Sequence, residues 1–339
     1  MMGSRSVATQ TVLSVRNLKV ALPSAEQQLT PVRNVSIDVQ AGRTLCIVGE
    51  SGCGKSMTAM GIMRLLPDGA TISADGVELD GRDLAQLSER EFRDLRGDRL
   101  AIIFQDPMTC LNPVLTIGQQ MTEVYRRHRG GTKTQARARA ILLLEQTGVT
   151  SAHRRLQQYP HELSGGLRQR VMIATALMCD PKVLIADEPT TALDVTVQLQ
   201  ILRLLRDVQQ RIGLAMVLIT HDLGVVAHVA DDVAVMYAGE IVEMGTVNSV
   251  FANPLHPYTR GLMECIPVPG RTERGGRLNS IPGIVPSLRD LIVGCGFRGR
   301  CKFAREACAE PIGLRAAGDN RRVRCVLPNE PQSSQGLTA

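Results

Sequence analysis

The sequence contains no tryptophan, and aromatic residues make up only 3% of its 339 residues. Binding of single-stranded nucleic acid relies on aromatic side chains placed among basic residues. No dense Lys/Arg stripe with interleaved aromatics occurs, so we expect no nucleic-acid partner despite the net charge of +6. Long hydrophobic runs are absent as well: no stretch approaches the ~18 apolar residues of a membrane-spanning helix, and residues 1–20 lack the apolar core of a signal peptide. These absences predict a chain that is made and kept in the cytosol.

Short apolar runs bounded by turn residues recur along the chain, at 45–48, 100–104, 183–186, 216–219 and 233–237. Such continuous runs, separated by helical patterns, are typical of strands buried on both faces of a parallel sheet. Residues 13–20 and 32–39 alternate partially instead, which fits an antiparallel hairpin-like piece. The segment at roughly 112–180 shows helical spacing without a comparable strand. The fold class is therefore α/β, with a mostly parallel sheet, an N-terminal antiparallel β piece and a helical insertion.

The octet Gly-Glu-Ser-Gly-Cys-Gly-Lys-Ser at 49–56 matches the phosphate-loop pattern G-x-x-x-x-G-K-[ST]. It follows an apolar run and opens a helical pattern, which is the required strand-loop-helix context. Lys55 would meet the β- and γ-phosphates, and Ser56 would ligate Mg²⁺. The residues predicted to bind the nucleotide here are Gly49, Glu50, Ser51, Gly52, Cys53, Gly54, Lys55 and Ser56.

Polar residues follow three of the apolar runs, where ligands bind in open α/β folds. The run at 183–186 ends in Asp187, which would stabilise Mg²⁺, and Glu188, which is placed to accept a proton from an attacking water. Gln105 and His221 follow two further runs and could contact Mg²⁺ or water and the γ-phosphate, respectively. This set predicts hydrolysis of a nucleoside triphosphate.

A second glycine pair stands at 163–170, in Leu-Ser-Gly-Gly-Leu-Arg-Gln-Arg. Ser164 can N-cap a helix while Gly165 and Gly166 let an anion approach the free N–H groups at its positive end. One nucleotide held by residues 49–56 has no use for a second phosphate site. The motif therefore predicts an active site composed from two subunits.

These motifs, in this order, resemble those of ATP-binding cassette (ABC) transporter ATPases over nearly all of residues 12–250. In family terms they are similar to Walker A, the Q-loop (Gln105), the signature (163–170), Walker B (183–188), the D-loop (191–194) and the switch histidine (His221). The resemblance implies that two cassettes sandwich ATP head to tail. Walker A of one cassette then faces a trans site on the other, formed by Ser164, Gly165, Gly166, Gln169 and Asp194.

One position departs from the family pattern. The family commonly stacks adenine on an aromatic residue between the first strands, where this sequence has Leu22. A leucine offers apolar contact without an aromatic face. We expect Leu22 to contact adenine and the base selectivity to be relaxed.

The proline-punctuated segment at 251–328 resembles the extension of the dipeptide, oligopeptide and nickel importer subfamily, notably in Asn-Pro-Leu-His-Pro-Tyr at 253–258. It also contains Cys295, Cys301, Cys308 and Cys325, with C-x₅-C-x₆-C-x₁₆-C spacing. Thiols at this density in the cytosol favour a metal site over disulfides. Close C-x₂₋₄-C zinc pairs are missing, and the resemblance implies a [4Fe–4S] cluster, with zinc or free thiols as alternatives. Residues 329–339 are polar, and we expect them to be disordered.

The leading hypothesis is an ATP-hydrolysing subunit of an importer for peptides or a related small solute, bound to the cytoplasmic face of the membrane. The resemblance implies as partners a second ABC ATPase subunit, by preference a paralogue, two membrane-spanning permease subunits and an extracytoplasmic solute-binding protein. Two alternatives stay open: a soluble ABC ATPase acting on ribosomes or DNA, and an importer of nickel or another non-peptide solute. A GTPase switch is disfavoured because no Asn-Lys-x-Asp segment occurs.

Overall fold

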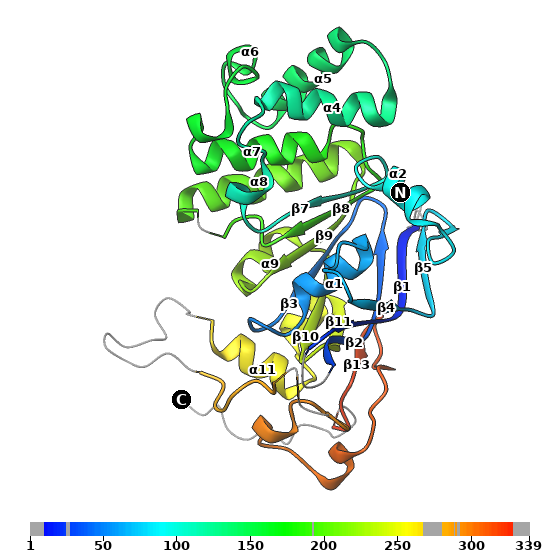
Figure 1. Cartoon of the computed structure of the whole chain (residues 1–339). Coiled ribbons are helices and arrows are strands. Elements are labelled where there is room, and N and C mark those ends of the chain that lie inside the picture. Colours follow the sequence, from blue (N-terminus) through cyan, green and yellow to red (C-terminus); the bar gives the residue numbers. More distant parts are fainter. Residues whose placement is uncertain are drawn as a thin grey trace, which may run out of the picture.

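One mixed sheet runs through the molecule in the order β6-β5-β1-β2-β11-β10-β3-β9-β8-β7 (Figure 1). The structure, a computed structural model, describes residues 10–24, 28–191, 193–266, 280–287, 289 and 292–327. Five neighbouring strands are parallel: β10 (Asp232–Tyr237), β3 (Thr44–Val48), β9 (Ala215–Thr220), β8 (Val183–Asp187) and β7 (Leu100–Ile103). They coincide with the five apolar runs of the sequence, and the predicted α/β class is confirmed.

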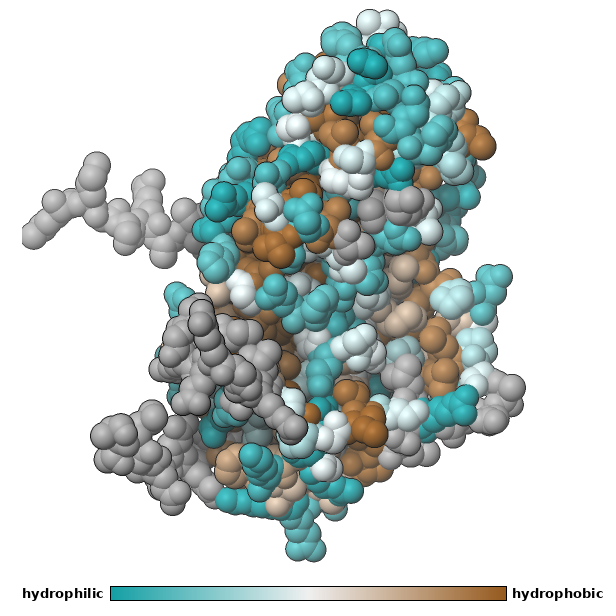
Figure 2. Space-filling view, turned by 90° about the vertical axis from the view of Figure 1, so that its left-hand side faces the viewer, coloured by the Kyte–Doolittle hydropathy of each residue, from teal (hydrophilic) through white to brown (hydrophobic). Residues whose placement is uncertain are grey.

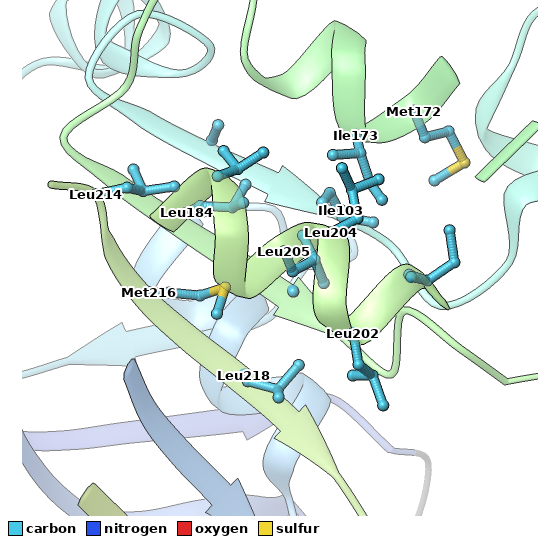
Figure 3. Close-up of a cluster of buried hydrophobic side chains, with 14 of the residues drawn as sticks. Ile103, Met172, Ile173, Leu184, Leu202, Leu204, Leu205, Leu214, Met216 and Leu218 are labelled. Carbon is cyan, nitrogen blue, oxygen red and sulfur yellow. The ribbon is translucent and has the colours of Figure 1, made fainter. Parts of the chain in front are cut away.

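The parallel strands are buried on both faces, which is why their sequences do not alternate with polar residues. In β8, Leu184 and Ala186 belong to one core cluster, whereas Val183 and Ile185 belong to the cluster on the opposite face. Figure 3 shows the first of these clusters, in which side chains from the sheet meet those of α7 (Gly165–Ala176) and α8 (Val195–Ile212). The sheet is thus fixed from both sides, and the loops at its carboxyl edge start from rigid strands.

The N-terminal part of the sheet is antiparallel, as predicted. Strand β1 (Thr11–Leu22) pairs with β2 (Leu29–Gln40), β4 (Thr71–Ser73) and β5 (Gly76–Leu79), and β5 pairs with β6 (Arg82–Asp83). Helix α1 (Lys55–Met63) lies beside this part, and α2 (Glu89–Leu95) follows it in the chain.

A group of helices occupies one end of the molecule, at the top of Figure 1. It comprises α4 (Ile117–Arg129), α5 (Lys133–Gln146), α6 (Ala152–Arg155), the 3₁₀ turn η1 (Pro160–Glu162) and α7. The sequence sets where α4 and α5 begin, since Thr116 and Thr132 each form a capping box with a glutamine three residues later. The short α3 (Pro107–Cys110) connects this group to β7.

The C-terminal part lies at the other end of the molecule from this group of helices, at the bottom of Figure 1. After α9 (Leu223–Val229) and β11 (Glu240–Thr246) come α10 (Val247–Ala252), α11 (Pro257–Glu264), the 3₁₀ turns η2 (Arg298–Arg300) and η3 (Glu306–Ala309), β12 (Arg315–Ala316) and β13 (Arg322–Val323). Strand β13 pairs with β11, so this part joins the main sheet. The division at residue 250 stays a prediction, and the expected disordered tail at 329–339 lies outside the described residues.

Hydrophobic residues on the surface are distributed in patches. On the face shown in Figure 2 these patches are separated by hydrophilic residues. Among the helices that the structure describes, none has the length and apolar character needed to cross a bilayer.

Candidate active site

The loop at 49–56 connects β3 to α1, as the motif predicts. Gly54 precedes the helix with φ +104°, and a Cβ there would lie 2.2 Å from the carbonyl oxygen of Pro31. Only glycine fits this backbone conformation and this close approach. Any larger residue at position 54 would therefore force the loop out of this conformation.

Lys55 and Ser56 lie at the start of α1. The Lys55 side chain is buried, and its Nζ donates to the carbonyl oxygens of Gly49 (2.9 Å) and Glu50 (3.1 Å). The Ser56 hydroxyl donates to Asp187 Oδ1 at 3.0 Å, so a hydroxyl and a carboxylate 131 residues apart in the chain become neighbours. Burial raises the pKa of Asp187, and the hydrogen bond from Ser56 acts in the opposite direction. A hydroxyl beside a carboxylate is an oxygen ligand pair suited to Mg²⁺.

Glu188 follows Asp187 at the end of β8, and its carboxylate contacts three side chains that come from three loops. Its carboxylate accepts hydrogen bonds from Gln105 Nε2 (3.1 Å) and Thr191 Oγ1 (2.9 Å). His221 Nδ1 lies 3.4 Å from its other oxygen. The Glu188 backbone has φ +44°, and its N–H donates to the carbonyl oxygen of Ile219 on β9. A carboxylate fixed in this way can accept a proton from a water molecule.

A cavity of about 450 Å³ joins these groups. Its lining residues are Pro31, Ser51, Gly52, Gly54, Lys55, Ser56, Met57, Gln105, Glu188 and His221. The loop, the carboxylate and the two single polar residues named from the sequence thus surround one space. Leu22 does not line it; Leu22 pairs with Leu29 at the end of the first hairpin, and Pro31 lies at the cavity in its stead.

Gly165 and Gly166, the second glycine pair, are not among the residues that line this cavity. Ser164 stands at the N-cap position of α7, as predicted, but its hydroxyl makes no capping hydrogen bond. Ser164 and Gly165 are exposed at the start of the helix. Gln169, by contrast, is 1% exposed, because it lies on the inner side of α7. Ser164 and Gly165 are thus accessible at the surface, whereas Gln169 is not.

Asp194 has a local role that the sequence motif did not reveal. Its carboxylate accepts the N–H of Val197 at 2.9 Å and caps α8. The side chain is nevertheless exposed, at the start of the helix that follows Walker B.

Comparison with known proteins gives two family matches and many relatives. Residues 32–191 match the family described as "ABC transporter". "Probable peptide ABC transporter ATP-binding protein y4tR" of Sinorhizobium fredii is 51% identical over 89% of this chain and 90% of its own length. The chain belongs to the ABC transporter ATP-binding proteins. This ATPase also resembles "Oligopeptide transport ATP-binding protein AppD" of Bacillus subtilis, at 46% identity over 96% of this chain and 99% of the relative.

A second family model matches a C-terminal part of the ATPase. Residues 242–308 match "Oligopeptide/dipeptide transporter, C-terminal region". Among solved structures, a dimeric post-hydrolysis state of the ATP-binding cassette MJ0796 bound to ADP and Pi has a TM-score of 0.61 at 28% identity, covering 69% of this chain and 98% of that one. The comparisons give no support to an ATPase that acts on ribosomes or DNA.

The contacts made by three residues, Thr191, Tyr258 and Arg300, were not predicted from the sequence. Thr191 holds Glu188, although a serine or threonine three residues after a strand-end acid is only a weak signal. Glu50, in the phosphate loop, is bound by two residues of the C-terminal part, Tyr258 and Arg300. Their separation of more than 200 residues leaves no local pattern to detect.

The four cysteines of the C-terminal part lie near one another, and Cys295 interacts electrostatically with the other three. Burial raises the pKa of the Cys295 thiol to about 11. Backbone N–H groups donate to the sulfur atoms of Cys308 and Cys325, each at 3.5 Å. Among the described residues, which include all four, no group of three or more His, Cys, Asp or Glu side chains is arranged to hold a metal ion. The [4Fe–4S] cluster and its zinc alternative both stay predictions.

Proposed function

We propose that this ABC ATPase hydrolyses ATP to drive the import of peptides across the cytoplasmic membrane. The observation that carries the proposal is the placement of Glu188 beside the phosphate loop, in a chain whose C-terminal part matches the oligopeptide/dipeptide transporter region. The relatives named above are peptide and oligopeptide transport proteins by their names. The relatives give no support to the alternative of an importer for nickel or another non-peptide solute.

In the proposed reaction, the loop at 49–56 binds the phosphates through backbone N–H groups and Lys55. Ser56 and Asp187 fit a magnesium ion, since their oxygens lie 3.0 Å apart and Ser56 lines the cavity. Mg²⁺ would supply positive charge to the β- and γ-phosphates. Met57 and Pro31 offer the apolar part of the cavity in place of Leu22.

Glu188 is the proposed general base. It takes a proton from the attacking water as the bond from water oxygen to the γ-phosphorus forms and the bond to the bridging oxygen breaks, which yields ADP and phosphate. Gln105 and Thr191 hold its carboxylate in place, and His221 lies where it can donate a hydrogen bond to the γ-phosphate. Each of these residues comes from a separate loop, so the arrangement depends on all of them.

The trans site is proposed to consist of Ser164, Gly165, Gly166 and Asp194 acting on a partner's nucleotide. Support comes from their position: the first two are exposed and lie away from the cavity of their own chain. The Ser164 hydroxyl makes no capping hydrogen bond, and the two glycines carry no side chain. The N–H groups at the start of the helix are therefore accessible to an anion. The burial of Gln169 removes that side chain from the proposed contact. The similar cassette MJ0796 is described as dimeric.

The proposed assembly contains a second ABC ATPase subunit, by preference a paralogue, with two membrane-spanning permeases and an extracytoplasmic solute-binding protein. The chain would bind peripherally to the cytoplasmic face of the membrane through the permeases. Co-purification of the tagged chain from membranes, followed by identification of the bound subunits, tests this assembly. Recovery with ribosomes or DNA would contradict it.

A [4Fe–4S] cluster is proposed for the four cysteines. Cys295, Cys301, Cys308 and Cys325 would supply the four thiolate ligands of such a cluster. Support comes from the electrostatic interaction of Cys295 with the other three cysteines and from the backbone N–H groups that donate to the sulfurs of Cys308 and Cys325. Two arginines of this segment form ion pairs with carboxylates and not with the cysteines: Arg300 pairs with Glu50, and Arg321 pairs with Glu243. Anaerobic purification with iron and sulfide analysis tests the proposal, and a colourless, zinc-loaded protein would refute it.

Replacement Glu188→Gln tests the catalytic proposal. Loss of a general base should lower ATP hydrolysis by about a hundredfold or more, while ATP binding persists because the phosphate loop is unchanged. The measurement is phosphate release by the assembled transporter, together with equilibrium binding of a fluorescent ATP analogue. Glu145→Gln, an exposed glutamate of α5, is the matched control and should hydrolyse ATP like the wild type. Unchanged turnover in Glu188→Gln would overturn the role of Glu188.

A further inference from the structure

The C-terminal part of the chain is hydrogen-bonded to the phosphate loop at one residue, Glu50. These hydrogen bonds are called the tether below. The Glu50 backbone N–H donates to the Tyr258 hydroxyl on α11 at 2.9 Å. The Glu50 carboxylate accepts two hydrogen bonds from the Arg300 guanidinium, at 2.6 and 3.1 Å. Both the backbone and the side chain of this loop residue are therefore fixed by residues more than 200 positions away.

Arg300 is itself held rigidly. Its guanidinium also donates to the carbonyl oxygens of Ile281 (3.0 Å) and Pro282 (2.9 Å) and lies 3.3 Å from the Tyr237 hydroxyl. The side chain is 5% exposed. A planar guanidinium with most of its donors engaged has little freedom, so it presents two N–H groups to Glu50 in a fixed geometry.

Tyr258 is equally fixed, by aromatic packing. Its ring is fully buried and lies 4.6 Å from the Tyr237 ring and 5.4 Å from the Phe297 ring, measured between centroids. Phe297 stands three residues before Arg300, in the segment that carries the cysteines. The two contacts to Glu50 thus belong to one packed unit.

Because Glu50 carries a negative charge, its pairing with Arg300 matters for nucleotide binding. The Glu50 carbonyl oxygen accepts a hydrogen bond from Lys55 Nζ at 3.1 Å, so Glu50 stands beside the lysine that is proposed to meet the phosphates. A free carboxylate there would repel the phosphates of ATP. Paired with a guanidinium in a bidentate geometry, the carboxylate is neutralised and turned toward the C-terminal part.

We infer that Arg300 and Tyr258 are positioning residues of the ATP site, and that Arg300 cancels the charge of Glu50 so that the loop can hold a triphosphate. The inference rests on the proposed ATP site. Neither residue lines the cavity, and both act through Glu50. Because the tether shapes the loop and leaves Glu188 untouched, it should affect nucleotide binding more than the hydrolytic step.

The test is equilibrium binding of a fluorescent ATP analogue with Mg²⁺ to the full-length chain. We expect Arg300→Gln to weaken binding about tenfold, equivalent to ~1.4 kcal/mol. Glu50→Gln removes the tether and the charge together, so it should weaken binding only about threefold, and the double variant should match Glu50→Gln because no charge is left to cancel. Raising the salt concentration should reduce the deficit of Arg300→Gln. In the transporter, Arg300→Gln should raise KM for ATP with kcat nearly unchanged.

Arg298→Gln is the matched control, since Arg298 is exposed two residues away and should bind the analogue like the wild type. Wild-type affinity in Arg300→Gln, or a double variant as weak as Arg300→Gln, would overturn the inference. If Arg300→Gln fails to fold, Arg300→Lys and Tyr258→Phe decide: each should bind about threefold more weakly, and wild-type affinity in both overturns it. Failure of the wild type to bind the analogue would instead refute the proposed ATP site.

Discussion

Lowering the pH from about 7.5 to about 5 should destabilise the folded ATPase by about 2 kcal/mol through His256 alone. This histidine is 1% exposed and stands at the N-cap of α11. Its Nδ1 accepts the N–H of Tyr258 at 3.0 Å, so the folded state holds the neutral ring with an unprotonated Nδ1. Protonation would place a charge in the interior and remove the acceptor that caps the helix.

The size of the effect follows from the pKa of His256. Burial lowers that pKa to about 3, and the nearby charge of Arg260 acts in the same direction. The neighbouring Glu243 carboxylate accepts the backbone N–H of His256 and is already paired with Arg321. The unfolded chain binds a proton at about 6.5, so stability is complete above that pH and falls as the pH drops from about 6.5 toward about 3.

The assay is urea unfolding of the full-length chain at a series of pH values, compared with His256→Asn. Asparagine can cap α11 but does not titrate. Its smaller volume lowers the free energy of unfolding by an amount independent of pH, which cancels in the comparison of slopes. The wild type should lose about 2 kcal/mol more than the variant between about pH 7.5 and about pH 5. Parallel curves for the two proteins would refute the assignment of a buried, neutral His256.

Two stability predictions concern other buried features, each measured by thermal or urea unfolding. Gly54→Ala should destabilise far more than Gly52→Ala, because a Cβ at Gly54 would meet a backbone carbonyl whereas Gly52 has open space at the same sign of φ; equal losses would contradict this reading. Arg321→Met should cost about 3–5 kcal/mol by leaving the fully buried Glu243 unpaired. Arg322→Met, which removes a half-buried and longer ion pair with Asp38, should cost less than about 1 kcal/mol, and similar costs for the two arginines would count against the buried pair.

The parts of the fold that were predictable are those with a local signal. Continuous apolar runs identified all five parallel strands, and the phosphate-loop spacing located the start of α1. The strand-end position of Glu188, Gln105 and His221 placed them at one cavity, because parallel strands end at the same edge.

Features that depend on pairing between distant segments were not predictable. The contact of Arg300 with Glu50 is one example, and the buried pair of Glu243 and Arg321 is another. Side-chain orientation within a helix was a further difficulty. Gln169 lies in the signature motif, but the packing of α7 against its neighbours turns it inward.

The three contacts on Glu188 have a consequence for how this ATPase can be altered. The Glu188 carboxylate has two oxygens and is contacted by Gln105, Thr191 and His221. Substitution of any one of these three residues therefore changes the side-chain rotamers and hydrogen bonds that are available to the other two. Effects measured one residue at a time will show epistasis and should not be summed. A library that varies these three positions jointly would therefore reach combinations that stepwise mutagenesis discards at the first step.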